Sequence, residues 1–185
     1  MRNRCSWAKD KGPLLIAYHD TEWGRPVHND QKHFELLCLE GQQAGLSWEL
    51  VLKKREAYRK IFYRFDPKKV AEMTDEQLLI ATQNKEIIRN KLKVFSIRKN
   101  ARRFLTIQSD EGSFDYYIWK FVEDTSLPYL EIRSFSPESI AISKELKSRG
   151  FSFVGPKIIY SYLQAAGLVV DHTANCFLSK PALPR

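Results

Sequence analysis

The sequence predicts an all-α protein, a helical bundle formed by a single domain over residues 1–185. Apolar residues recur at helical spacing through most of the chain. Capping residues, prolines and glycines bound these segments, and no segment alternates as a half-buried strand would. The composition, 43% hydrophobic and 28% charged, is ordinary for a folded protein. The length of 185 residues allows one core, or two small lobes that share one.

Two helices are predicted in the first third of the chain. Asp30 is the expected N-cap of the first helix, which ends near Gly41. Its apolar face comprises Phe34, Leu37 and Cys38. The second helix runs from Trp48 to Phe62, and Asp66-Pro67 interrupts the pattern after it.

The middle of the chain predicts a capped helix, a long basic helix and a short aromatic one. Thr74 and Gln77 form a capping box. A long amphipathic helix is predicted from Ile87 to Ile107, with apolar positions that include Ile88, Leu92, Phe95 and Leu105. Its polar side carries Arg89, Lys91, Lys93, Arg98, Lys99, Arg102 and Arg103. We interpret this charge run as a solvated helix face. Phe114 to Val122 predicts the aromatic helix.

The segment 139–167 predicts two helices joined by a tight hairpin. A cap, a proline and an acid at 136–138 begin the first helix, which ends at Gly150. The second helix starts at Pro156 and stops before Gly167.

Glycines at both ends of this hairpin, Gly150 and Gly155, permit a left-handed backbone and the close approach of a ligand. The second helix would direct free N–H groups outward, where a DNA phosphate fits without sequence readout. Lys147, Arg149 and Lys157 add positive charge nearby. The alternative is an ordinary helical hairpin, which many all-α proteins contain.

The net charge of +8 and the pI near 9.4 favour a polyanionic partner, although many basic proteins bind no nucleic acid. No apolar run is long enough to span a membrane. The first residues lack the apolar stretch of a signal peptide. We therefore expect a cytosolic protein without a membrane partner.

Two Cys/His pairs stand near the two ends of the chain, Cys5 with His19 and His172 with Cys176. The second pair is spaced so that both side chains can reach one ion. A Cys₂His₂ set would form a closed, structural Zn²⁺ site that ties the N-terminal segment to the C-terminal one. The alternative is a set of unrelated buried cysteines and surface histidines.

The remaining cysteine and histidines fit neither pair. Three cysteines in a cytosolic chain do not suggest a disulfide framework. Cys38 lies on an apolar helix face and is interpreted as a core residue. His28 and His33 have no partner pattern and are interpreted as surface residues.

Polar and aromatic residues are dense in two early stretches, 18–24 and 39–48. Glu40 follows an apolar helix face and precedes a glycine-bounded turn, which favours a cavity-facing carboxylate. Three of the four tryptophans lie near these stretches: Trp7, Trp23 and Trp48. Aromatic faces beside a carboxylate attract a flat cation, such as an N3-alkylated adenine. The alternatives are core packing for the tryptophans and a surface acid for Glu40.

Short motifs form a combined pattern over almost the whole chain. They are RCSW at 4–7, AYHD at 17–20, EWG at 22–24, LEGQQAGLSW at 39–48, LKKR at 52–55, GFSFVG at 150–155, and Asp171-His172 with Cys176. With this pattern the chain resembles the DNA-3-methyladenine glycosylase I family, within the helix–hairpin–helix DNA glycosylase superfamily. The 39–48 block is highly specific. The commoner hairpin of the superfamily starts Leu-Pro-Gly, whereas Phe-Val precedes Gly155 here.

The resemblance implies a fold, a metal and a base pocket. The fold is a helical bundle with a helix–hairpin–helix and a Zn²⁺ site that joins the termini. The matching zinc ligands are Cys5, His19, His172 and Cys176. The matching base pocket consists of Glu40, Tyr18 and Trp48, with Trp7 close by, and we also assign Trp23 to it. Leu15 departs from the family, which often has a pocket tyrosine at this position.

The resemblance also implies a monomeric base-excision repair enzyme of the bacterial cytosol or nucleoid. Its substrate would be double-stranded DNA with alkylated bases, and its product free 3-methyladenine. We hypothesise that Glu40 hydrogen-bonds the edge of a flipped base. Tyr18 and Trp48 would stack on the ring while water attacks the sugar.

Four alternatives remain open from the sequence. Asp171 stands where related glycosylases have a catalytic aspartate. Because it is next to the predicted ligand His172, we prefer the interpretation that it orients this ligand. Lys157 stands about where lyase-active relatives have a Schiff-base lysine, and we prefer a phosphate contact. A zinc-stapled DNA-binding module without catalysis would also explain the charge, the hairpin and the zinc set. An ordinary helical scaffold predicts neither zinc nor salt-dependent DNA binding.

Overall fold

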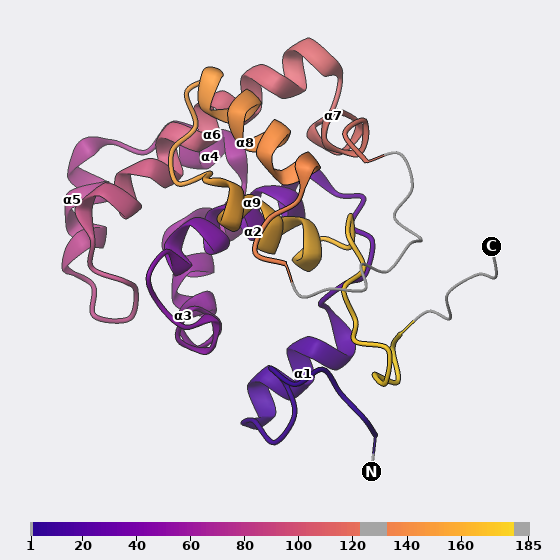
Figure 1. Cartoon of the computed structure of the whole chain (residues 1–185). Helices are drawn as coiled ribbons and strands as arrows, with labels where there is room; N and C mark the ends of the chain where they lie inside the picture. The colour runs from indigo at the N-terminus through magenta and orange to yellow at the C-terminus, as the bar shows by residue number, and fades with distance from the viewer. Residues whose placement is uncertain (1, 123–132, 180–185) are drawn as a thin grey trace.

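The computed structural model describes residues 2–122 and 133–179, and this part of the chain contains helices and no strands, as predicted (Figure 1). The elements in chain order are α1 (Pro13–Thr21), α2 (Asp30–Gln43), α3 (Trp48–Ile61), a 3₁₀ turn η1 (Tyr63–Phe65), α4 (Pro67–Ala71), α5 (Asp75–Gln83), α6 (Lys91–Glu111), α7 (Phe114–Trp119), α8 (Pro137–Ser148) and α9 (Pro156–Ala165).

Local capping explains most helix starts. The capping box of Thr74 and Gln77 is present at α5, and Ser136 begins α8 as expected. The prediction that Asp30 caps α2 was wrong, because the side chain of Asn29 accepts the hydrogen bond from the backbone N–H of Lys32. The Asp30 carboxylate instead accepts the N–H groups that begin α7. A side chain cannot serve two helix ends, and the sequence does not show which one it serves.

Three other predictions differ from the structure. No helix was predicted where α1 lies, and α1 carries Tyr18 and His19. The long basic helix begins at Lys91, because the side chain of Asn90 accepts a hydrogen bond from the N–H of Lys93 and caps it there. Leu92, predicted as an apolar position of this helix, is 74% exposed.

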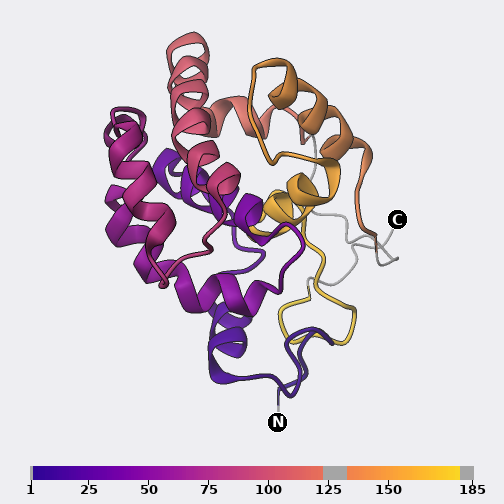
Figure 2. The same cartoon turned by 90° about the vertical axis from the view of Figure 1, so that its left-hand side faces the viewer.

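Helix α2 is the central element of the bundle. It contacts α3, α6, α7 and α9, which surround it in two perpendicular views (Figures 1 and 2). Every residue from His33 to Gln42 is buried, including Cys38 as predicted. The interpretation of His33 as a surface residue was wrong. Its ring lies between the Tyr162 hydroxyl, 2.7 Å away, and the Asp115 carboxylate, 3.0 Å away.

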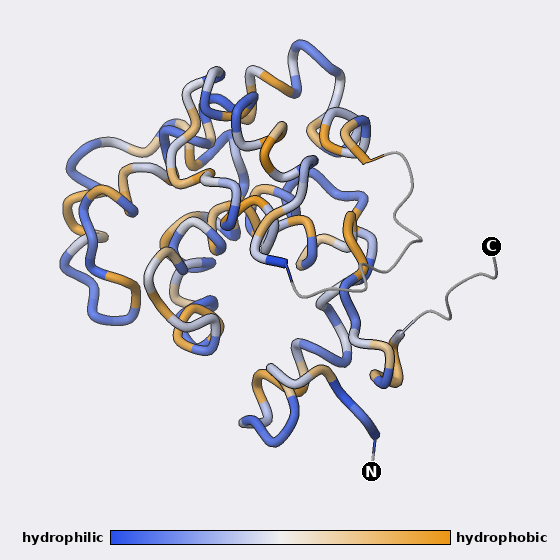
Figure 3. The backbone as a smooth tube through the Cα atoms, in the orientation of Figure 1, coloured by the Kyte–Doolittle hydropathy of each residue, from blue (hydrophilic) through white to orange (hydrophobic). Residues whose placement is uncertain are grey.

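Residues 2–12 and 171–179 lie beside α1, below the main group of helices (Figure 1). Figure 3 shows apolar and polar residues mixed along the helical segments. No helix within residues 2–122 and 133–179 is long and apolar enough to cross a membrane.

A buried ion pair joins α1, α2 and α3. The Arg55 guanidinium donates two hydrogen bonds to Glu22, at 2.7 and 2.8 Å, and one to Glu35, at 2.7 Å. Arg55 and Glu35 are buried, so removal of Arg55 leaves the buried Glu35 carboxylate with the Arg59 guanidinium as its one remaining guanidinium partner.

We therefore expect Arg55→Met to lower the free energy of unfolding by about 3 kcal/mol. The exposed pair Lys53–Glu49 on α3 is the matched control, and Lys53→Met should lower this energy by less than about 1 kcal/mol. Urea unfolding of both variants measures the difference. Equal losses would show that burial does not strengthen the Arg55 pair.

Candidate functional site

Glu40 differs from the other buried polar side chains of α2. Glu35 accepts hydrogen bonds from Arg55 and Arg59. Gln42 donates to the backbone carbonyl of Lys93 and accepts from the Tyr58 hydroxyl. Glu40 is 3% exposed, and its Oε2 has no hydrogen-bond partner. Because buried polar atoms in folded proteins are nearly always paired, this oxygen marks a candidate ligand contact.

Tyr18, whose hydroxyl lies near the Glu40 carboxyl group, and its neighbour Trp48 also carry buried polar atoms. Tyr18 from α1 and Trp48 from the start of α3 lie with ring centroids 5.4 Å apart. The Tyr18 hydroxyl and the Trp48 indole N–H are both buried and lie near each other, but neither makes a hydrogen bond of ordinary geometry. Burial, and then the neighbouring Glu40 carboxylate, raise the pKa of Tyr18 well above its usual value. The site therefore offers a carboxyl group, a hydroxyl and an N–H beside two aromatic rings.

Burial alone raises the pKa of Glu40 to about 8. The carboxyl group is therefore mostly protonated at neutral pH, because burial disfavours the charged form. A flat cation in contact with it would shift the equilibrium back toward the carboxylate. Tyr18 and Trp48 would attract the same cation through their ring faces. The arrangement suits a positively charged aromatic ligand.

The shifted pKa of Glu40 makes the stability of the protein depend on pH. The folded state holds the proton of the Glu40 carboxyl group more tightly than the unfolded state does. The contribution of this proton to stability is complete below about pH 4.5 and is lost as the pH rises through about 8. Glu40→Gln has no such proton. We expect the stability advantage of Glu40→Gln over the unaltered protein to grow by up to about 4 kcal/mol between pH 5 and pH 8.

Urea unfolding of both proteins at pH 5, 6.5 and 8 checks this expectation. Parallel stability profiles would show that the Glu40 carboxyl group titrates normally.

A buried lysine that was not predicted as a site residue supports the turn after Glu40. Lys93 Nζ donates to the backbone carbonyls of Gln42 and Ala44, at 2.8 and 2.6 Å, and so satisfies the C-terminal end of α2. The interpretation of Lys93 as part of a solvated face was wrong, because this side chain is buried. The position of Lys93 in the helical pattern does not reveal that the C-terminal end of α2 lies next to it in the fold.

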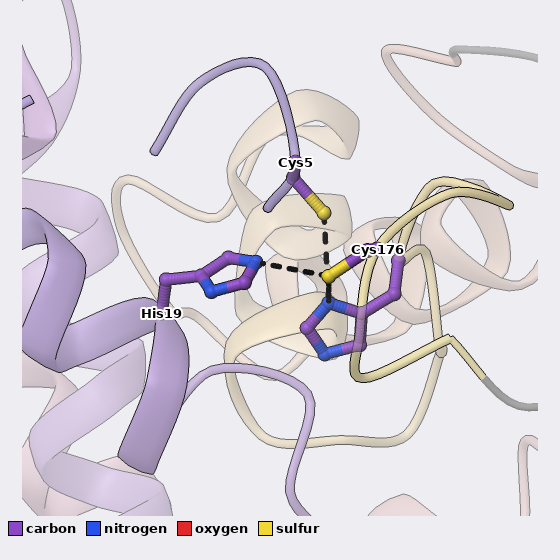
Figure 4. A group of neighbouring side chains, drawn as sticks. Cys5, His19 and Cys176 are labelled. Atoms are coloured by element: carbon purple, nitrogen blue, oxygen red, sulfur yellow. Dashed lines mark hydrogen bonds between the residues drawn. The ribbon is translucent and has the colours of Figure 1, made fainter. Parts of the chain in front are cut away.

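The four predicted metal ligands, Cys5, His19, His172 and Cys176, are buried together. Their ligand atoms all lie within 4.8 Å of one another. Cys176 Sγ is 3.5 Å from His19 Nε2 and from His172 Nδ1, and Cys5 Sγ is 3.5 Å from the same His172 nitrogen. Figure 4 shows Cys5, His19 and Cys176 converging from both ends of the chain. In tetrahedral zinc sites the S···N separation is about 3.6 Å, so the spacing fits this ion.

The surroundings of the cluster orient its histidines. Burial lowers the pKa of His172 to about 4, which keeps the imidazole in the neutral form that binds metal. His19 Nδ1 lies 2.8 Å from the Asp20 carboxylate, which also accepts hydrogen bonds from Arg4. Asp20, and not Asp171 as the sequence suggested, is therefore the carboxylate that contacts a histidine of the cluster. The Asp171 carboxylate instead accepts hydrogen bonds from two side chains of α9, Tyr160 and Gln164.

Two predicted base-binding tryptophans lie between the aromatic site and the Cys/His cluster. Trp7 lies 6.3 Å from Tyr18 and 5.0 Å from Trp23, measured between ring centroids. The Trp23 ring lies 4.7 Å from that of His172. Trp23 therefore packs against the cluster. Leu15, which stands where the family often has a tyrosine, is buried on α1.

The predicted DNA-binding residues surround the connection between α8 and α9. Gly150 has φ +86, as a left-handed turn requires, whereas Gly155 has φ −64 and caps α9. A Cβ on Gly155 would meet nothing within 4 Å, so the backbone there is open to a close approach. Lys147 and Lys157 are exposed. Arg149 is paired with Glu145 and Asp110, which reduces its availability to a phosphate.

Together these features define a basic, helical protein with a buried carboxyl group beside aromatic rings and a buried cluster able to hold a metal. The family model described as methyladenine glycosylase matches residues 7–179. The chain belongs to the methyladenine glycosylase family.

Named relatives agree with this membership over almost their full length. The chain is 48% identical to DNA-3-methyladenine glycosylase 1 of Escherichia coli, over 94% of this chain and 95% of the relative. It is 44% identical to DNA-3-methyladenine glycosylase of Haemophilus influenzae, over 95% and 97%. A variant of 3-methyladenine DNA glycosylase I, solved in complex with 3-methyladenine, is 36% identical. It superposes with a TM-score of 0.89 over 95% of this chain and 96% of that one.

Proposed function

We propose that this protein excises 3-methyladenine from alkylated double-stranded DNA by hydrolysis of the N-glycosyl bond, with Glu40, Tyr18 and Trp48 as its base-recognition site. The observation that carries the proposal is the unpaired Oε2 of Glu40, buried near the Tyr18 hydroxyl, which in turn lies beside the Trp48 indole. These atoms match a base that presents both donors and acceptors at its edge. The names of the relatives support the substrate.

The proposed reaction uses charge already present in the substrate. Methylation at N3 makes the base of the nucleotide a cation and therefore a good leaving group. After the nucleotide is flipped out, the bond between C1′ and N9 breaks and its electron pair neutralises the base. Water adds to the oxocarbenium-like C1′ and loses a proton, which leaves an abasic sugar. The protein needs no strong acid at the base under this scheme.

The Glu40 carboxylate would favour the charged substrate over ordinary adenine. A positive charge next to the carboxyl group lowers its pKa, so the proton leaves on binding and an ion pair forms. Unmodified adenine carries no such charge and would have to bind with Glu40 still protonated. Tyr18 and Trp48 would stack on the ring, and Trp7, whose ring lies 6.3 Å from that of Tyr18, would extend the aromatic surface.

The connection between α8 and α9 would hold the DNA as a helix–hairpin–helix. The open backbone at Gly155 and the first N–H groups of α9 suit a phosphate. Lys147 and Lys157 would add sequence-independent attraction. Lys157 is exposed and lacks the desolvation that would activate it as a lyase nucleophile, so we propose hydrolysis alone.

The buried Cys₂His₂ cluster would hold a structural Zn²⁺ ion. Four ligands close a tetrahedral site and leave no open position for chemistry. His19 is the residue after Tyr18 on α1. The proposed ion would therefore fix α1, and with it the Tyr18 ring, as well as the two chain ends.

Incubation of the purified protein with duplex DNA that contains radiolabelled 3-methyladenine tests the proposed activity. We expect release of the free methylated base and an abasic site, without strand cleavage. Salt-dependent DNA binding without base release would instead indicate a binding module. Covalent trapping by borohydride would indicate a lyase. We expect the active species to be a monomer.

A further inference from the structure

Asn100 of α6 holds the hairpin 150–155 by two hydrogen bonds to the backbone of Ser152. Its Nδ2 donates to the Ser152 carbonyl at 2.9 Å, and the Ser152 N–H donates to its Oδ1 at 2.8 Å. Asn100 is 4% exposed. Because the amide side chain uses its donor and its acceptor together, it fixes both the position and the orientation of Ser152. Figure 2 shows the α8–α9 connection beside α6.

The next residue of the hairpin, Phe153, has a left-handed backbone with φ 57. This conformation is rare for a bulky side chain and persists only where the surroundings impose it. Asn100 fixes the residue before Phe153. On the other side, the Ser143 hydroxyl donates to the Val154 carbonyl at 2.6 Å.

The left-handed turn places Phe153 against Gly41 of α2. A Cβ on Gly41 would lie 3.3 Å from Phe153 Cβ and 3.4 Å from the Phe153 carbonyl oxygen. Gly41 directly follows Glu40. Contacts close to the backbone therefore connect Asn100, through the hairpin, to the helix that carries the carboxyl group.

We propose that Asn100 is a positioning residue for base excision, which sets the placement of the DNA-holding hairpin relative to Glu40. The inference rests on the proposed function. Under the proposed function the hairpin holds the duplex whose flipped base enters the Glu40 site, so a shift of the hairpin against α2 misplaces the base against Glu40. A misplacement of about 1 Å can lower a rate about 100-fold.

The test compares Asn100→Ala with Gln108→Ala. Gln108 is also on α6 and donates its amide to Asp30, away from the hairpin. Two quantities are measured: the dissociation constant for free 3-methyladenine by tryptophan fluorescence, and the single-turnover release rate from methylated duplex at saturating protein. For Asn100→Ala we expect a dissociation constant within about twofold of normal and release slowed at least about tenfold. Gln108→Ala should leave both unchanged.

Normal release by Asn100→Ala would overturn the positioning role. So would a parallel loss of base affinity and release, because that pattern indicates general loosening of the base site. If the alanine variant does not fold, Asn100→Asp keeps the size and the acceptor but sets an oxygen against the Ser152 carbonyl, and the same selective loss is expected. Absence of release by the unaltered protein would refute the proposed function together with this inference. Normal release by the unaltered protein and by Asn100→Ala would refute this inference and leave the proposed function standing.

Discussion

Glu40→Gln is expected to slow release of 3-methyladenine from duplex DNA by about 100-fold or more, which corresponds to about 3 kcal/mol of transition-state stabilisation. The amide has nearly the same shape as the carboxyl group but cannot become an anion. It therefore cannot form the ion pair that we propose with the alkylated base. The effect should be large because Glu40 is buried and has no other charged partner to share the interaction.

Single-turnover release at pH 7.5 measures this effect, and Glu49→Gln provides the control. Glu49 lies beside Trp48 on α3 but pairs with Lys53 at the surface. We expect its variant to retain the normal rate, and both variants to bind undamaged duplex normally. Normal release by Glu40→Gln would remove Glu40 from the mechanism.

Glu40→Gln should also make the protein more stable above pH 5, because the raised pKa of the Glu40 carboxyl group makes the unaltered protein lose stability as the pH rises. Loss of activity combined with a gain in stability would identify Glu40 as a residue retained for function, because a buried unpaired carboxyl group does not stabilise the fold. Substitution of a residue that served only the fold would lower both the activity and the stability of the protein.

Cys176→Ala is expected to abolish metal retention and to lower the free energy of unfolding by about 4 kcal/mol or more. The proposed Zn²⁺ site connects residues more than 150 positions apart in the sequence. Without the ion, the N-terminal segment and α1 lose their connection to the C-terminal segment. Base release should fall as well, because Tyr18 lies on the same helix as His19.

Cys38→Ala is the matched control for this prediction, because Cys38 is equally buried but lies in the core of α2, outside the cluster. Its variant should retain the metal and lose only about 1–2 kcal/mol through the small cavity. Elemental analysis after dialysis and urea unfolding with and without a chelator measure both variants. A metal-free unaltered protein, or equal losses in the two variants, would show that the cluster is only a packed core.

The helices and their caps were largely predictable because they depend on short-range rules. The capping box at Thr74, the proline start of α8 and the left-handed Gly150 require only neighbouring residues. Errors arose where one side chain could serve two partners. Asp30 was expected to cap α2 and instead accepts the N–H groups of α7.

The candidate site was only partly predictable from individual residues. Reasoning from composition and spacing left Glu40 open as a surface acid and the two Cys/His pairs open as unrelated residues. The combined motifs, through the family resemblance, indicated which of these alternatives to prefer. The structure brings Cys5, His19, His172 and Cys176 within reach of one ion and places Tyr18 beside Trp48.

The sequence by itself determined the helical class, most helix boundaries and the set of chemically capable residues. Only the tertiary structure decided which buried groups are paired. His33 finds Asp115 and Tyr162, Lys93 finds the carbonyls at the end of α2, and Glu40 is left with an unpaired oxygen. Pairing in the interior depends on which distant segments meet, and a helical repeat specifies the face of a side chain but not the neighbour across it.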